Sequence, residues 1–195
     1  MCFVEDLSRL GDITVDGLYW PTDMVADPDM SCVYIGDRYG IKEKHSDPDK
    51  PGLFAITVSI KPSDLTLEVA LDGHPVETVP DRLPDHPVDG ISHHLLEVTP
   101  AGLSLTSQNY LLVACEHEKR GRSLRFFRTE RSGSDAVRLV ELEERRITLQ
   151  VDRYLLHAVE VNRERFVISR VHKGENVHWI LVVNNSGNQV RSKML

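Results

Sequence analysis

The sequence has few cysteines and no paired cysteine motif. Cys2, Cys32 and Cys115 are widely spaced, and none of them forms a C-x-x-C pair. Such spacing does not favour a disulfide or a metal site. We therefore expect reduced thiols in an intracellular protein, with Cys32 and Cys115 buried in strands.

Long apolar segments and a positive net charge are absent as well. The strongest apolar run near the C-terminus, WILVV from Trp179, is far too short to span a bilayer. The N-terminal MCFVEDLSRLGD carries acidic residues and no long apolar region, so it is not a secretory signal, and no lipidation motif is present. A net charge of −7 argues against a dedicated nucleic-acid binder, because phosphate affinity depends on Lys and Arg. A cytoplasmic location is expected.

Several catalytic and metal-binding motifs are also missing. The chain has no G-x-S-x-G nucleophile elbow, no H-E-x-x-H or H-x-x-x-H spacing and no D-x-D-x-D-G calcium loop. No motif specifies a reaction or a cofactor. The absences favour a non-catalytic protein.

What the sequence does contain is a repeated series of short apolar segments. CVYIGD, NYLLVAC and RFVIS are rich in β-branched or aromatic residues. Each follows another apolar segment, respectively DMVAD, GLSLT and HAVEV, across the turn-like linkers PDMS, SQN and NRER. A third apolar segment follows each, respectively LFAITV, SLRFF and HWILVV, and then a more polar fourth: TLEVAL, AVRLVEL and QVRS. VELEERR, from Val140, has helical propensity, but ITLQV, from Ile147 to Val151, alternates with period two and predicts a strand.

This order predicts the blades of a β-propeller. In a blade the innermost strand lines the channel, the two middle strands are packed on both faces, and the outer strand meets water. If the segment 72–99 between the blades is set aside, equivalent strands recur at roughly 50–55 residues, near the length of four-stranded blade repeats. The expected fold class is all-β, a partial β-propeller of four-stranded antiparallel blades in a single domain over residues 1–195. We expect blades at roughly 12–71, 100–142 and 147–195, with a tight NNSG turn in the last, and a Pro-, His- and Asp-rich inter-blade loop or linker at 72–99.

Two stretches carry a family resemblance. WPTDMVADPDMSCVYIGD resembles the opening of an NHL-repeat blade, and HAVEVNRERFVISRVH with HWILVVNNSGNQVRS is similar to a whole blade. Asn184 and Asn185 stand where NHL blades commonly have Asp, and the middle blade departs from the pattern with the charged insertion EHEKRGRS. Propellers close with about four to eight blades. Three blades therefore leave apolar faces for a second copy of the chain, for missing blades of a longer chain, or for other segments to cover.

Histidines are the candidate metal ligands. His93 and His94 lie in the acidic loop, and the resemblance places His157 at the start of an inner strand near the channel. Propeller lactonases and lyases hold zinc or calcium at such axial positions, so the resemblance permits a metal site. For His157 we favour a hydrogen bond to the neighbouring blade over a metal site. For His93 and His94 we favour a solvated loop over a metal site.

A basic stretch provides a second candidate site. Arg122, Arg125 and Arg128 flank Phe126 and Phe127, and some NHL propellers bind RNA through a positive face. Strand alternation along SLRFFRTE would instead place Phe126 in the core, and the net charge opposes RNA. The preferred function is a non-catalytic, NHL-like module that binds a protein partner through rigidly held loops. The alternatives are a metal-dependent propeller enzyme of lactonase or lyase type and an RNA-binding NHL module.

Overall fold

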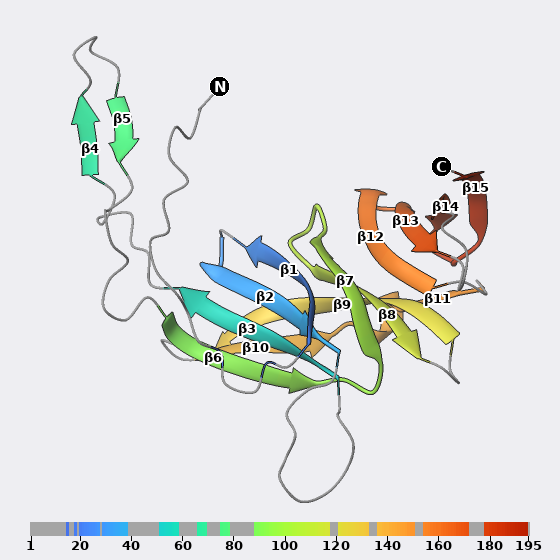
Figure 1. Ribbon diagram of the computed structural model, residues 1–195, viewed down its shortest axis with the longest axis horizontal. Coiled ribbons are helices and arrows are strands. Elements are labelled where there is room, and N and C mark those ends of the chain that lie inside the picture. Colours follow the sequence, from blue (N-terminus) through green and yellow to red (C-terminus); the bar gives the residue numbers. More distant parts are fainter. Residues whose placement is uncertain are drawn as a thin grey trace, which may run out of the picture.

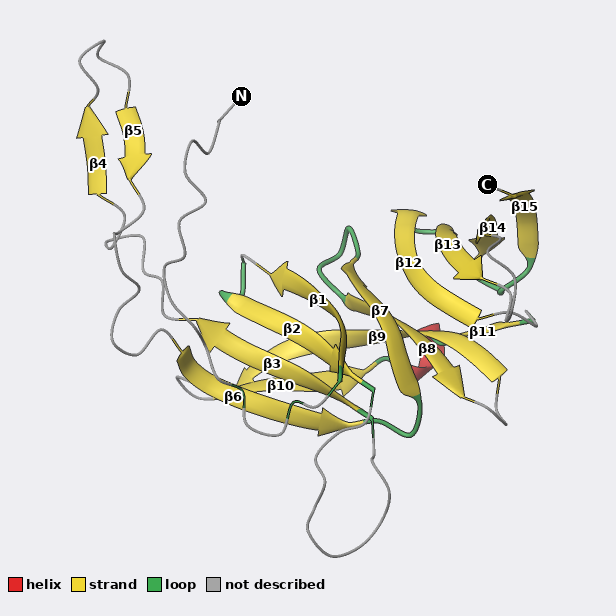
Figure 2. Cartoon of the chain, in the orientation of Figure 1, coloured by secondary structure: helices red, strands yellow, loops and turns green. Residues whose placement is uncertain are grey.

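Three antiparallel sheets and one separate hairpin make up the described part of the chain (Figures 1 and 2). The computed structural model describes residues 15, 18, 20–27, 29–38, 51–58, 66–69, 75–78, 88–117, 121–132, 136–150, 154–171 and 178–194. Within these residues the fold is all-β, and the one short helical segment is a 3₁₀ turn, η2 (Glu143–Arg145).

Each sheet is an antiparallel meander. The first sheet has the order β1 (Pro21–Asp27), β2 (Cys32–Asp37), β3 (Gly52–Val58) and β6 (Val88–Leu95). The middle sheet has the order β7 (Thr99–Leu105), β8 (Leu111–His117), β9 (Gly121–Ser132) and β10 (Ala136–Glu141), and β11 (Ile147–Leu149) pairs with β9. The last sheet has the order β12 (Tyr154–Asn162), β13 (Arg165–Val171), β14 (His178–Asn184) and β15 (Gln189–Met194).

The middle sheet is buried on both faces. Successive side chains of a strand point to opposite sides, so the unbroken apolar run of β8 supplies two cores. Leu111 and Val113 join the core shared with the first sheet, whereas Leu112 and Ala114 join the core shared with the last sheet. A continuous apolar segment was expected for a doubly packed strand, and the burial of β8 confirms that expectation.

Aromatic residues anchor both cores. Tyr34 from the first sheet and Phe127 from the middle sheet are buried in one core. In the other core the rings of Phe126 and Phe166 meet edge to face, with their centroids 5.6 Å apart. The predicted core position of Phe126 is therefore confirmed. The expected burial of Cys32 and Cys115 is confirmed too, and both are free thiols.

A buried polar cluster joins the first and middle sheets. The Asp27 carboxylate accepts a hydrogen bond from the Met30 amide at 3.1 Å, which closes the turn between β1 and β2. It also accepts one from the Tyr34 hydroxyl at 3.3 Å, and that hydroxyl lies 2.7 Å from Thr129 Oγ1 on β9. Asp27 is 1% exposed, so these partners satisfy an otherwise costly buried carboxylate.

The fourth strand of the first sheet differs from the sequence prediction. TLEVAL was expected to supply it, but β4 (Thr66–Val69) pairs with β5 (Pro75–Thr78) in a hairpin that projects away from the sheets (Figure 1). β6 takes the outer position beside β3 instead. Residues 72–99 were expected to be a loop, and the structure places β5, β6 and the start of β7 within them. The physical reason is local: β4 finds a partner a few residues further along the chain at low loop-closure cost.

The boundary between the second and third repeats also differs. Within ITLQV, Ile147–Leu149 form a strand as predicted, but this strand pairs with β9 and not with the last sheet. Ile147 and Leu149 are buried in the core between the two sheets, which explains why they attach to the middle sheet. The last sheet begins at Tyr154. EHEKRGRS, expected to be an insertion, largely continues β8 and β9, whose ends pair His117 with Gly121.

The three sheets pack one after another, and no closed ring is formed by the described residues (Figure 1). The first strands of the three sheets, β1, β7 and β12, lie next to one another, with β7 in the middle. The tight turn predicted at NNSG joins β14 to β15, and Gly187 in it has a φ of +79°.

Candidate binding sites

His157 lies where the first strands of the three sheets, β1, β7 and β12, meet. Its Nε2 donates a hydrogen bond to the Leu103 carbonyl oxygen at 2.8 Å and lies 3.3 Å from Asp23 Oδ2. The same Asp23 oxygen accepts a hydrogen bond from the Leu103 amide at 2.8 Å. Next to it, the Ser104 hydroxyl donates to the Ala158 carbonyl oxygen at 2.8 Å. The expected hydrogen bond of His157 to a neighbouring sheet is confirmed, and the cluster connects β1, β7 and β12.

His93 and His94 do not join His157. Both are on β6, the outer strand of the first sheet, opposite Phe54 and Leu53 of β3. His94 Nε2 lies 3.3 Å from the Val137 carbonyl oxygen, a contact between the first and middle sheets. The described residues contain no group of three or more His, Cys, Asp or Glu side chains that could hold a metal ion. The other histidines and aspartates of the predicted acidic cluster are outside the described residues, except Asp89 on β6.

The three arginines proposed as a basic patch lie on β9 but do not share one face. Alternation puts Arg122 and Arg128 on the side of Phe126 and Arg125 on the opposite side. Arg125 is 8% exposed, and its Nη1 lies 3.2 Å from Glu141 Oε2.

The other two arginines of the predicted patch also have acidic partners. Arg122 Nε lies 3.4 Å from Glu116 Oε1, and Arg128 Nη2 lies 2.5 Å from Glu130 Oε1. The prediction of a single basic surface from these residues is therefore wrong. Strand pairing brings Glu116 of β8 opposite Arg122, whereas Glu130 lies two residues from Arg128 on β9 itself. Sequence spacing alone did not reveal the first of these pairs.

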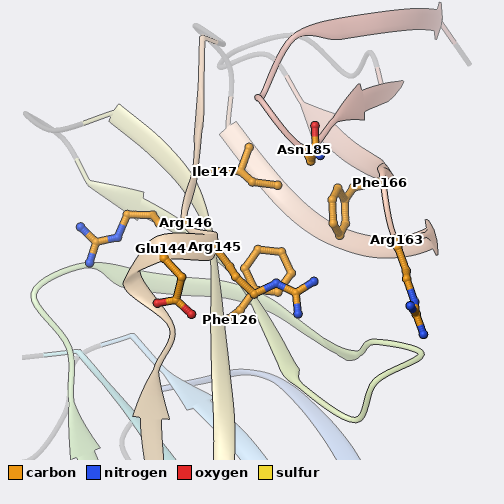
Figure 3. A pocket seen from close by; sticks show the side chains of 8 residues that line it. All are labelled: Phe126, Glu144, Arg145, Arg146, Ile147, Arg163, Phe166 and Asn185. Carbon is orange, nitrogen blue, oxygen red and sulfur yellow. The ribbon is translucent and has the colours of Figure 1, made fainter.

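A cavity that the sequence did not predict lies between the middle and last sheets. It has a volume of about 220 Å³ and opens to the surface beside η2 (Figure 3). Its walls come from β9, η2, β11 and the two hairpin turns of the last sheet: Phe126, Glu144, Arg145, Arg146, Ile147, Arg163, Phe166 and Asn185. The residues are far apart in the sequence, so no motif unites them.

Arg145 is held rigidly at this cavity. Its guanidinium lies over the rings of Tyr110 and Phe126, at 4.8 and 5.4 Å from their centroids. Its Nη1 also donates a hydrogen bond to Gln108 Oε1 at 3.0 Å. Stacking and hydrogen bonding therefore fix the position of its charge.

The neighbouring Arg146 points away from the cavity (Figure 3). Its Nε and Nη2 donate to Glu141 Oε1 at 3.1 and 2.6 Å. This hydrogen bonding raises the pKa of Arg146. Glu141 is shared between Arg146 and Arg125, so one carboxylate faces two guanidinium groups. The other charged groups at the cavity are Arg145, Arg163 and Glu144.

The turn between β14 and β15 forms one rim of the cavity. Asn184 Oδ1 accepts hydrogen bonds from the Ser186 and Asn188 amides at 3.1 and 2.9 Å, which closes the turn. Gly187 brings the turn against β11, because a Cβ at that position would overlap the Thr148 carbonyl oxygen. The close approach positions Asn185 over the cavity.

The last sheet has a second candidate surface on the side away from the middle sheet. Val159, Val167 and Val182 are neighbours across three strands, and Ile180 lies two residues along β14 on the same side. Val161 follows Val159 on β12 at a shift in the register with β13. These five residues define the open face. Val161 is 60% exposed and Val159 is 39% exposed, whereas the residues between them in the strands, such as Phe166 and Leu181, are buried. None of the five belongs to a core cluster of the described residues.

The corresponding side of the first sheet is covered. Ile35, Phe54 and Ile56 are at most 8% exposed there and pack against Val15 and Leu18 from the segment before β1. The two ends of the stack are therefore different. On the first sheet Met24, which lies opposite Ile35, is 66% exposed, whereas the described part of the last sheet leaves Val159 and Val161 exposed.

Burial governs the chemistry of the two described cysteines. It raises the pKa of the Cys32 thiol to about 11 and that of the Cys115 thiol to about 12. A thiol of this kind is almost entirely protonated near neutral pH and is a poor nucleophile.

Comparison with known proteins adds no assignment. No protein-family model, curated protein or solved structure matches the sequence. The described part of the chain also contains no helix with the length and apolar character needed to cross a membrane. The NHL-type resemblance stays a prediction, and the sites above have to be interpreted from their own geometry.

Proposed function

We propose that the chain is a non-catalytic, NHL-like propeller module whose partner is another protein bound to the open face of the last sheet. The partial-propeller interpretation is supported by three consecutive antiparallel sheets of four, five and four strands that pack face to face with their first strands adjacent. In such an architecture each blade is packed on both sides by its neighbours.

The exposed open face is the observation that carries the proposal. It presents five aliphatic side chains on a rigid sheet, and contiguous apolar surface of this kind marks interaction sites in folded proteins. Arg191 and Lys193 lie opposite Val182 and Ile180 on the outer strand β15. A partner with an apolar centre and an acidic rim would complement this surface, because the basic residues border it on one side.

The test uses charged substitutions at the most exposed positions of this surface. In a Val159→Arg, Val161→Arg double variant the face would carry two charges that a partner would have to desolvate, so we expect association to be lost. Met24→Arg is the control, because Met24 is 66% exposed on β1 of the first sheet and lies outside the open face. Unchanged circular dichroism and unfolding midpoint would establish that both variants fold.

Binding is measured in two ways. Light scattering on the purified chain tests for a species of twice 22.1 kDa, and quantitative cross-linking in cell extract tests for a different partner. The proposal predicts at least one association that the double variant abolishes and Met24→Arg preserves. If every association survives in the double variant, or if none is found, the open face is not a protein-binding surface.

A further inference from the structure

We propose that the outer edge of β15 binds an extended acidic segment of another protein, which adds a strand to the last sheet. This inference goes beyond the proposed function, because it concerns backbone groups at the edge of the sheet, whereas side chains of β12, β13 and β14 form the open face. The bound segment would pair with β15 on the side opposite to β14 (Figure 1).

The edge of β15 is open in the described part of the chain. β15 ends the strand order of the last sheet, so the amide and carbonyl of every second residue point away from β14. All of its residues are exposed, and none is proline. At β10, the edge strand of the middle sheet, the Val137 carbonyl oxygen instead lies 3.3 Å from His94 of β6. Backbone groups that can pair with an added strand are therefore available at β15.

The side chains of β15 favour a negatively charged partner. Arg191 and Lys193 lie opposite Val182 and Ile180, so both point to the same side of the sheet. β15 contains no acidic residue, and neither basic side chain has an ion pair with another described residue. Opposite charges that face each other across neighbouring strands stabilise their pairing. We therefore expect acidic residues at alternate positions of the added strand.

The other side of β15 favours apolar residues between the acidic ones. Met194 lies opposite Trp179 on that side and is 58% exposed. An apolar side chain of the added strand would remove part of the Met194 surface from water. A segment in which acidic and apolar residues alternate therefore complements both sides of β15.

The charge of β15 also disfavours a second copy of this strand as the partner. Antiparallel pairing of two β15 strands, edge to edge, would bring Arg191 and Lys193 of both copies to one side of the joined sheet. Like charges that face each other across strands are destabilising. The edge is therefore protected against self-pairing and open to an acidic strand.

The probe is the acetylated and amidated octapeptide (Glu-Val)4, and its control has the same composition in the order Glu-Glu-Val-Val, repeated once. Both peptides carry the same charge, so electrostatic attraction alone would bind them equally, whereas only the first alternates with the period of a strand. Titration of the whole chain, followed by NMR at physiological ionic strength, should give a Kd of about 1 mM or tighter for (Glu-Val)4. The control should bind at least about tenfold more weakly. Equal affinities, or no binding of (Glu-Val)4, would overturn strand addition.

Hydrogen exchange locates the bound peptide. At saturating (Glu-Val)4, amides of β15 should exchange more slowly, because the added strand accepts hydrogen bonds from those that point away from β14. Binding through side chains alone would leave these amides unprotected. Unchanged exchange in β15 with the peptide bound would therefore also overturn the proposal.

A reversal of charge connects the binding to the named residues. The double variant Arg191→Glu, Lys193→Glu should bind (Glu-Val)4 at least about tenfold more weakly and should bind (Lys-Val)4 more tightly than the unsubstituted chain does. Arg138→Glu on β10 is the control and should change neither affinity by more than about twofold, since salt screens distant exposed charges. All three residues are exposed, so an unchanged unfolding midpoint is expected for both variants. Undiminished binding of (Glu-Val)4 to the double variant would refute the site at β15.

Discussion

Replacement of Gly187 by alanine tests how the last sheet is joined to the middle sheet. Gly187 lies in the turn between β14 and β15 with a φ of +79°. A Cβ at this position would overlap the Thr148 carbonyl oxygen and would lie 3.2 Å from Ile147 Cγ2, both on β11. The substitution therefore has two costs: backbone strain at positive φ and displacement of the turn from β11.

Gly121 allows the two costs to be separated. It begins β9 with a φ of +80°, and nothing lies within 4 Å of a Cβ added there. Gly121→Ala should therefore have the backbone cost alone, about 1–2 kcal/mol for an L-residue in the left-handed region. Part of this cost is offset by about 0.4–1 kcal/mol from the reduced entropy of the unfolded chain. Gly187→Ala should add about 1–3 kcal/mol for overpacking against β11.

Urea unfolding of both variants and of the unsubstituted chain is the assay. We expect both variants to lose stability, with Gly187→Ala the less stable by about 1–3 kcal/mol at unchanged m-value. The entropic effect on the unfolded chain is common to both substitutions and cancels in the difference. Equal destabilisation would refute the packing of this turn on β11, and with it this rim of the cavity between the middle and last sheets.

Two further predictions concern buried polar groups. Tyr34→Phe removes the hydroxyl between Thr129 and Asp27. It should lower the free energy of unfolding in urea by about 1–3 kcal/mol, because buried polar atoms lose a partner. A free energy of unfolding that is unchanged within error would show that water replaces the hydroxyl. For Cys32 and Cys115, burial raises the folded-state pKa to about 11 and about 12 from an ordinary 9.0, so the unfolded chain ionises first. Their contribution to stability is complete below about pH 9 and falls as the pH rises through the folded values, and a double alanine variant should show a shallower loss over that range. Thiol reagents should modify Cys32 and Cys115 only on unfolding, and rapid labelling of either residue in the native chain at neutral pH, located by peptide mapping, would contradict its burial.

Local patterns predicted much of the strand content. Unbroken apolar runs such as NYLLVAC became doubly buried strands, because both sides of β8 meet a neighbouring sheet. The alternation of ITLQV predicted a strand, and the Asn and Gly of NNSG predicted a tight turn. The predicted bond from His157 to a neighbouring sheet also has its counterpart in the structure.

Pairing partners were harder to predict than strands. TLEVAL has a strand pattern whether it pairs with β3 or with β5, so the pattern alone did not show that β6 completes the first sheet. The same limit applies to β11, which pairs back to β9 through the buried Ile147 and Leu149. The sequence suggested one basic surface made of Arg122, Arg125 and Arg128. In the structure, strand alternation places Arg125 on the opposite side of β9, and each of the three has an acidic partner.

The amino-acid sequence by itself determined the all-β class and the positions of most strands and turns, because these depend on local periodicity and backbone preferences. The tertiary structure decided which strands pair, which arginines are compensated and which face of the last sheet remains open. It also brought Arg145 and Arg163 to one cavity from two different sheets. Such outcomes depend on contacts between residues that are distant in the chain, and the free energy of those contacts is not encoded in any one local segment.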